Sequence, residues 1–182
     1  VNSFKSQHPD INIKLIEMPS IQQEHELIKG RIDLGFMRKP EEDNLSFIPL
    51  GKDFLSVVTH PDIKNKKQTT NVLIHEQNLL LLSETSNPEL YHIVSHYLNN
   101  CNYDKKPAQY FTSISSVLAL VGSRMGITIL PHSIISFLKP NFFCQTLPGS
   151  QSEWSLGLAW NKKLDISLRA EFISSVINDK SQ

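Results

Sequence analysis

The stretch EMPSIQQEHELIKGRIDLGFMR, residues 17–38, constrains the fold more than any other part of this 182-residue chain. The residues INIKLIEM, which lead into it, are rich in β-branched and apolar types and predict a strand. SIQQEHELIK has helical spacing, and IDLGFM predicts a second, buried strand. We expect Ser20 to cap the helix in a capping box with Gln23, and Gly30 to end it. A strand, a helix and a strand in this order form half of a doubly wound α/β unit.

Two polar residues of this unit, Ser20 and Arg38, are expected to lie close together. In doubly wound sheets, ligands gather beyond the carboxyl ends of the strands, where helix N-termini also point. We therefore predict that Ser20 and Arg38 face one crevice, and that this crevice binds a small anion.

The composition limits the class of protein. The 40% of hydrophobic residues suffices for a packed core in one domain or two small lobes. Lys plus Arg and Asp plus Glu number 18 each, so the chain lacks the basic field of a DNA-wrapping surface. Cys101 and Cys144 lack a paired spacing and indicate reduced thiols in a cytosolic protein. We expect neither a membrane span nor a signal peptide.

The rest of the chain alternates strands and helices. We expect Asn87 to cap the helix PELYHIVSHYLNN, with Pro88 at its first position, and Ser113 to cap ISSVLALVGSRM, which Gly126 ends. Strands are predicted at LSFIPLG and FLSVVTHP, separated at Gly51, and at LLLL, AQYFTS, ITILP, FFCQTLP and WSLGLAW. The alternation predicts mainly parallel sheets with helices on both faces. The order of elements suggests two α/β lobes joined by two crossing segments, with a cleft between them.

The order of these motifs resembles the effector-binding domain of LysR-type transcriptional regulators, over nearly the whole chain. The resemblance rests on HPDINIKLIE, on a helix ending in GRIDLGF, and on FTSISSVLALVGSRMGITILP. EMPSIQQ and the arginine of GFMR are similar to the branch that senses intermediates of aromatic degradation such as muconate.

The resemblance implies an α/β fold of two Rossmann-like lobes with a central cleft, like type 2 periplasmic binding proteins. Lobe I would comprise residues 1–53 and 154–182, and lobe II residues 54–153. Members of the family also have a first strand in lobe I and, upstream, a winged helix-turn-helix and a linker helix. We expect the sequence, which starts without Met, to be a fragment that lacks these parts.

Carried over position by position, the resemblance implies an effector pocket of eight residues, which are Ser20, Arg38, Thr85, Ser86, Pro88, Ser113, Ile114 and Ser115. The physical chemistry agrees, because helix N-termini and a bidentate arginine both favour a carboxylate.

A simpler interpretation also fits these residues. Ser20, Asn87 and Ser113 would be ordinary helix caps, and Arg38 a solvated charge that pairs with Glu41 or Glu42. His92 and His96 have the spacing of a metal pair but lack an evident third ligand, so we predict no metal. No nucleophile elbow, phosphate-binding loop or dinucleotide motif occurs, and we predict neither an enzyme nor a cofactor.

We predict a ligand-sensing regulatory domain that binds a small organic acid between two lobes and alters how paired subunits present their DNA-binding heads. The partners would be the effector, further copies in a homodimer or homotetramer, and DNA through an absent N-terminal helix-turn-helix. Dimerisation would use the edge strand INIKLIEM and the first helix against PELYHIVSHYLNN. The protein would be cytoplasmic and bind no membrane. The alternative is a free-standing solute-binding protein or a small-molecule enzyme on the same fold.

Overall fold

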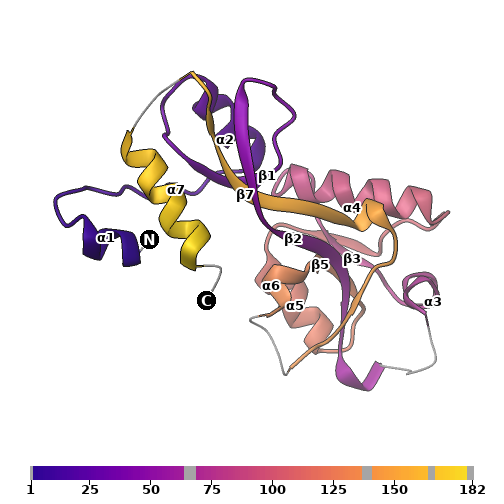
Figure 1. Cartoon of the computed structure of the whole chain (residues 1–182). Coiled ribbons are helices and arrows are strands. Elements are labelled where there is room, and N and C mark those ends of the chain that lie inside the picture. Colours follow the sequence, from indigo (N-terminus) through magenta and orange to yellow (C-terminus); the bar gives the residue numbers. More distant parts are fainter. Residues whose placement is uncertain (1, 64–68, 137–140, 164–166, 180–182) are drawn as a thin grey trace. The chain divides into compact units, whose positions relative to one another are not determined.

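The computed structural model describes residues 2–63, 69–136, 141–163 and 167–179. The chain divides into two compact units (Figure 1). Unit 1 comprises Val1–Lys52 and Trp154–Gln182, and unit 2 comprises Asp53–Glu153. Each unit combines helices and strands, which is the predicted α/β class.

Unit 1 is a small sheet with helices on both faces. Its elements are α1 (Asn2–Gln7), α2 (Ser20–Ile28), β1 (Gly35–Arg38), the first part of β2 (Leu45–Thr59), most of β7 (Glu153–Asn161) and α7 (Ser167–Asp179). The strand order is β1-β7-β2, and β1 runs antiparallel to β7. Neighbouring residues of β7, Leu158 and Ala159, point to opposite faces. Leu158 joins Phe172 in one core cluster, and Ala159 joins Leu27 in the other.

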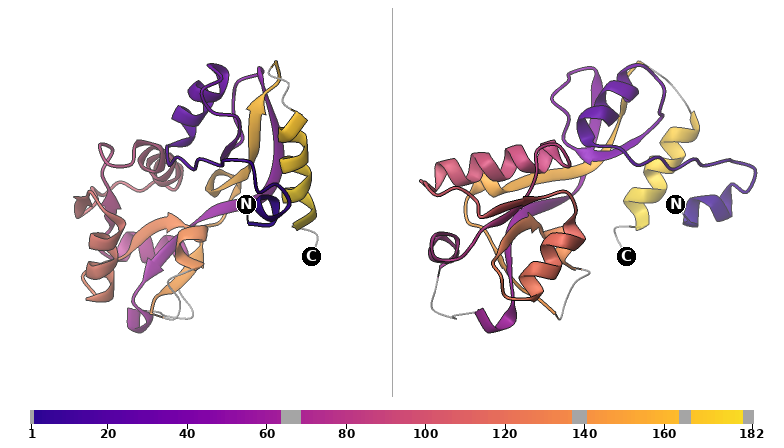
Figure 2. Two further views of the ribbon diagram at one scale, coloured as in Figure 1. Left: turned by 90° about the vertical axis from the view of Figure 1, so that its left-hand side faces the viewer. Right: turned by 180° about the vertical axis from the view of Figure 1, so that it is seen from behind.

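Unit 2 holds the rest of β2 and the middle of the chain. Its further elements are α3 (Thr70–Glu76), β3 (Leu80–Leu82), α4 (Pro88–Asn100), β4 (Gln109–Phe111), α5 (Ile114–Gly122), β5 (Thr128–Pro131), α6 (His132–Ser136), β6 (Phe143–Thr146) and the 3-10 turns Pro61–Ile63 and Ser150–Ser152. Figure 2 shows α4 and α5 on opposite sides of the strands of this unit. Because both faces are covered, all three residues of β3 are buried, as the leucine run predicts.

Three predicted helix ends are confirmed. Asn87 accepts a hydrogen bond from the Leu90 N–H at 3.1 Å, and Ser113 accepts one from the Ser116 N–H at 3.2 Å. Gly30 has a φ of 67° just beyond α2. The N–H of Gly30 and that of the next residue bond back to the last turn, which is the Schellman arrangement.

The predicted strand at residues 11–18 is wrong. This segment has no partner strand among the described residues, and Leu15 and Ile16 are 77% and 51% exposed. A strand needs a neighbour for its backbone hydrogen bonds, and alternation of side chains does not supply one. The edge strand of the predicted dimer interface is therefore not formed here.

The predicted capping box at α2 is also wrong. Pro19 occupies the N-cap position without a side-chain cap, and its carbonyl accepts the N–H groups of Gln22 and Gln23. The Gln23 amide donates to the Met18 carbonyl at 3.0 Å instead. The Pro19 carbonyl thus takes the third and fourth amides of the helix, and the Ser20 side chain, already inside the first turn, does not act as the cap.

Two glycines do not act as predicted. β2 runs through Gly51 without a break. Helix α5 ends at Gly122, with Ser123 as its C-cap and Arg124 beyond it at a φ of 62°, and not at Gly126. Gly126 is needed for close approach, because a Cβ there would lie 2.3 Å from the Asn78 carbonyl oxygen.

The expected dominance of parallel pairing is a further error. β1 with β7, β2 with β5 and β2 with β6 are antiparallel, while β3 and β4 are parallel. The difference arises at the long strands β2 and β7. β7 runs antiparallel to β1, and β2 runs antiparallel to β5 and β6.

Candidate functional site

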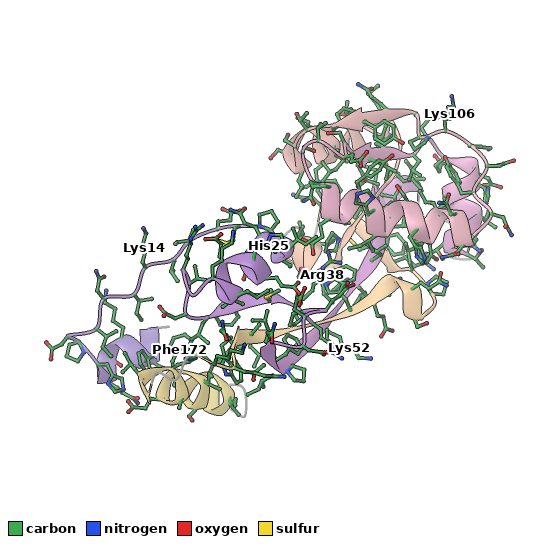
Figure 3. The ribbon with its side chains drawn as sticks, turned by 90° about the horizontal axis from the view of Figure 1, so that it is seen from above. Lys14, His25, Arg38, Lys52, Lys106 and Phe172 are labelled. Atoms are coloured by element: carbon green, nitrogen blue, oxygen red, sulfur yellow. The ribbon has the colours of Figure 1, made fainter. Side chains whose placement is uncertain are left out.

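In unit 1 the structure brings Ser20 and Arg38 together. Arg38, labelled in Figure 3, is the last residue of β1. Its backbone N–H points to the Ser20 Oγ at 3.5 Å. Ser20 lies in the first turn of α2, so the helix N-terminus and the strand end meet, as the sequence predicts. The predicted role of both residues in binding a ligand remains a prediction.

The side chain of Arg38 is half-buried beside Trp154. The guanidinium carbon lies 5.6 Å from the centre of the indole ring, within the range of a cation–π contact. Burial lowers the pKa of Arg38 below its ordinary value. A paired carboxylate would move the pKa in the opposite direction, so burial dominates here.

Unit 2 contributes two helix N-termini at neighbouring strand ends. β3 and β4 are parallel, with Leu82 opposite Phe111. The Ser83 N–H donates to the Phe111 carbonyl at 2.8 Å, and the Ser86 hydroxyl lies 3.4 Å from that carbonyl. The carboxyl ends of both strands therefore meet. This brings together the six predicted residues of this unit, Thr85, Ser86, Pro88, Ser113, Ile114 and Ser115.

The start of α5 offers the better anion site of the two. At α4, Pro88 has no N–H, and the Leu90 N–H is bonded to the Asn87 cap. At α5, the Ser113 side chain takes only the third amide, that of Ser116. The amides of Ile114 and Ser115 have no acceptor within the described part of the chain. They are donors for a carboxylate.

Hydroxyl groups surround the start of α4. The Ser83 hydroxyl donates to the Ser86 Oγ at 3.0 Å and lies 3.1 Å from the Thr85 Oγ1. The Ser86 hydroxyl also donates to the Ser83 carbonyl at 3.0 Å. This network fixes the loop between β3 and α4.

Sequence reasoning missed two residues of these sites. Ser83 organises the loop before α4, and its position directly after the leucine run was the available signal. Trp154 contacts Arg38, although 116 residues separate them (154 − 38), and only the pairing of β1 with β7 reveals the contact.

An open groove on unit 1 is a poorer place for an anion. Its lining includes the acidic run Glu41, Glu42 and Asp43, with Lys39 and Lys162 beside it. Lys162 donates to the Asp43 backbone carbonyl at 2.6 Å. Three adjacent carboxylates repel an organic acid, so this groove is a poorer candidate site than the surroundings of Arg38.

The described residues contain no group of three or more His, Cys, Asp or Glu that could hold a metal ion. His92 lies 3.5 Å from Glu84, and His96 approaches the Asn100 amide. In the part of the chain that the structure covers, no helix has the length and apolar character needed to cross a bilayer.

Comparisons with known proteins agree on one family. A family model described as the LysR substrate binding domain matches residues 1–178. The Hca operon transcriptional activator HcaR of Escherichia coli is 26% identical over 163 residues, which are 87% of this chain and 55% of that protein. The probable cat1 operon transcriptional activator of Acinetobacter lwoffii is 28% identical over 139 residues, 73% of this chain and 45% of that protein. The chain thus spans about half the length of these relatives.

Solved structures show the same fold. The effector-binding domain of BenM with its effector benzoate matches with a TM-score of 0.78 and 22% identity, over 99% of this chain and 83% of that one. The named relatives are transcriptional regulators, and they do not support a solute-binding protein or an enzyme. The predicted family and fold class are confirmed, and the chain belongs to the family of LysR substrate-binding domains.

Proposed function

We propose that this domain senses a small organic acid. The candidate groups for its recognition are Arg38 in unit 1 and, in unit 2, the amides of Ile114 and Ser115. The observation that carries the proposal is the start of α5, where two amides have no acceptor within the described residues. Each charge-assisted hydrogen bond to a carboxylate contributes about 1.5–3 kcal/mol. Ser20, Thr85, Ser86, Pro88 and Ser113 then shape the surroundings of these donors.

One solved relative supports an aromatic acid as the effector. The solved BenM domain carries its effector benzoate, and HcaR and the cat1 regulator are named as operon activators. We extend that ligand class to this chain, in which Arg38 ends β1 and can bind a carboxylate. The effector acts by binding one conformation of the domain more tightly than another.

The whole protein would be a regulator, not an enzyme. Because two relatives are named as HTH-type transcriptional regulators, we propose that the whole protein binds DNA through an N-terminal helix-turn-helix. We also propose a homodimer or homotetramer, and we place the regulator in the cytoplasm, where its DNA target lies.

A thermal-shift screen tests the effector class. The panel contains muconate, benzoate and amino acids, each measured against the protein and against Arg38→Ala. An acid at a hundred times its Kd stabilises the protein by about 2.7 kcal/mol, which raises the Tm by roughly 5–10 °C for a chain of this size. We expect one acid to give this shift and Arg38→Ala to remove most of it.

Arg31→Ala is the matched control. Arg31 belongs to the same unit, is exposed and lies 3.3 Å from Glu26, so its loss removes the same charge away from the site. A shift that both variants lose would indicate a general charge effect. The absence of any shift, with the protein folded, would contradict an acidic effector.

A further inference from the structure

Asn161, the last residue of β7, joins the sheet of unit 1 to the C-terminal end of α2. Asn161 is only 7% exposed, and its side-chain amide donates to the carbonyls of Leu27 and Ile28, at 3.1 Å each. The last carbonyls of a helix have no partners within the helix, so a side chain from elsewhere can bond to them. The Asn161 Oδ1 accepts the Lys163 N–H at 2.9 Å. The side chain is thus held through both its nitrogen and its oxygen.

Arg169 of α7 holds Asn161 from the other face of the sheet. Arg169 is 6% exposed, and its Nη1 donates to the backbone carbonyl of Asn161 at 3.0 Å. Side chains alternate along a strand, so Asn161 shares with Ala159 the face that packs against α2. Trp160 between them packs against the core cluster of α7 on the opposite face. Asn161 therefore connects the helices of both faces through buried hydrogen bonds.

The stability of the core gives no reason for the buried charge of Arg169. Its Nη2 is buried and has no hydrogen-bond partner in the part of the chain that the structure describes. A buried cation with an unsatisfied donor is unfavourable, and an apolar side chain would cost less free energy to bury. The bond to Asn161 places the charge one residue from the last carbonyls of α2, the negative end of the helix dipole. These features suit a residue that fixes one geometry.

Helix α2 extends from this anchored end to the candidate site. It is nine residues long and has Ser20 in its first turn. The Ser20 Oγ lies 3.5 Å from the Arg38 N–H, a distance already long for a hydrogen bond. A small displacement or tilt of the helix would therefore break this contact. The bonds of Asn161 oppose such a displacement, because they fix the opposite end of the same helix.

We propose that Asn161, held by Arg169, is a positioning residue that fixes α2, and with it Ser20, for the binding of the effector. The proposal rests on the proposed function, in which Ser20 belongs to the surroundings of the bound acid. It gives a role in the site to the end of β7 and to α7, which neither the sequence motifs nor the helix N-termini indicate.

Hydrogen exchange of the ligand-free protein tests the positioning itself. Asn161→Ala should speed the exchange of residues 22–25, at the end of α2 that is far from the substitution. Phe172→Leu is the control, since Phe172 lies in the core cluster of α7, on the opposite face from α2. It should speed the exchange of α7 and leave residues 22–25 unchanged. Unchanged exchange of residues 22–25 in Asn161→Ala, or equal acceleration in both variants, would overturn the proposal.

Titration calorimetry with the acid that shifts the Tm most in the panel tests the role in binding. Asn161→Ala should raise its Kd about 5-fold or more, as expected for one lost hydrogen bond in the site, and Phe172→Leu by less than about 2-fold. Arg169→Leu should also raise the Kd, and Arg169→Lys by less, because lysine keeps a donor for the Asn161 carbonyl. An unchanged Kd in Arg169→Leu would overturn the role of Arg169.

A double variant separates the positioning of Ser20 from a general structural effect. With Ser20→Ala already present and titrations extended into the millimolar range, Asn161→Ala should cause a much smaller loss of affinity than in the unaltered protein. An equal loss in both backgrounds, or no loss in either, would overturn the role of Asn161 and leave the proposed function standing. If no acid binds the unaltered protein, the proposed function fails first, and the role of Asn161 in effector binding fails with it.

Discussion

At the scale of single residues, the start of α5 combines a helix cap with two amides that are proposed to bind the effector. Ser113 caps the helix, and that part of the simpler interpretation holds. The cap leaves the amides of Ile114 and Ser115 without acceptors among the described residues. A cap and the proposed anion site can therefore share one helix, and a substitution that removes an amide without disturbing the cap separates the two roles.

Ile114→Pro is that substitution. Proline suits the first position of a helix, and Ser113 before it has the extended backbone that proline requires, with φ −135° and ψ 144°. We expect the Tm of the free protein to change little and the Kd of the bound acid to rise about 10-fold or more. Ile114→Ala removes the same side chain but keeps the N–H. Calorimetric titrations in which both variants lose affinity equally would show that the side chain matters and the amide does not.

At this scale, sequence reasoning is most accurate for residues that interact with near neighbours along the chain. Asn87 and Ser113 act on amides three residues away, so their roles are visible in the local pattern. Ser20 interacts with Arg38, 18 residues away, and the prediction that both lie in one place succeeded only through the expected fold. The contact of Arg38 with Trp154 depends on strand pairing and has no local signal.

At the scale of elements, the pairing of β7 with β2 holds unit 1 together. A Cβ at Gly157 would lie 2.1 Å from the Ile48 carbonyl oxygen, whereas one at Gly51 would meet nothing within 4 Å. Both glycines lie in strands, so alanine substitutions at the two positions can be compared directly. Only Gly157 is needed for close approach of the two strands.

We expect Gly157→Ala to lower the free energy of unfolding by about 2 kcal/mol or more, because the backbone of β2 must move. Gly51→Ala should leave it unchanged or raise it by up to about 1 kcal/mol, since alanine restricts the unfolded chain. Chemical denaturation of both variants measures the difference. Equal stabilities would show that β7 and β2 are not paired as described.

The errors in predicting elements have a common physical cause. The segment 11–18 has the composition of a strand, yet backbone pairing depends on a neighbour that its own residues do not specify. Gly51 was expected to break β2, but its backbone is extended and the strand continues. Local composition indicates which secondary structure a segment can adopt. Whether it forms a strand depends on a neighbouring strand that can pair with it.

At the scale of the whole molecule, the family assignment and the α/β class were predictable because they depend on the order of many elements. An error in one predicted element, such as the segment 11–18, leaves the predicted order of the other strands and helices unchanged. Charge balance also acts at this scale. With 18 basic and 18 acidic residues, the chain has no net field to attract an acid, so binding must come from local donors such as Arg38 and the start of α5.

Hydrogen exchange of the whole chain, with and without the acid found in the screen, tests this central claim most directly. We expect slower exchange in residues 36–40 and in residues 113–117 when the acid is present, and a loss of the effect in residues 36–40 in Arg38→Ala at the same acid concentration. Slower exchange elsewhere, with both segments unchanged, would contradict the claim that Arg38 and the α5 amides bind the effector.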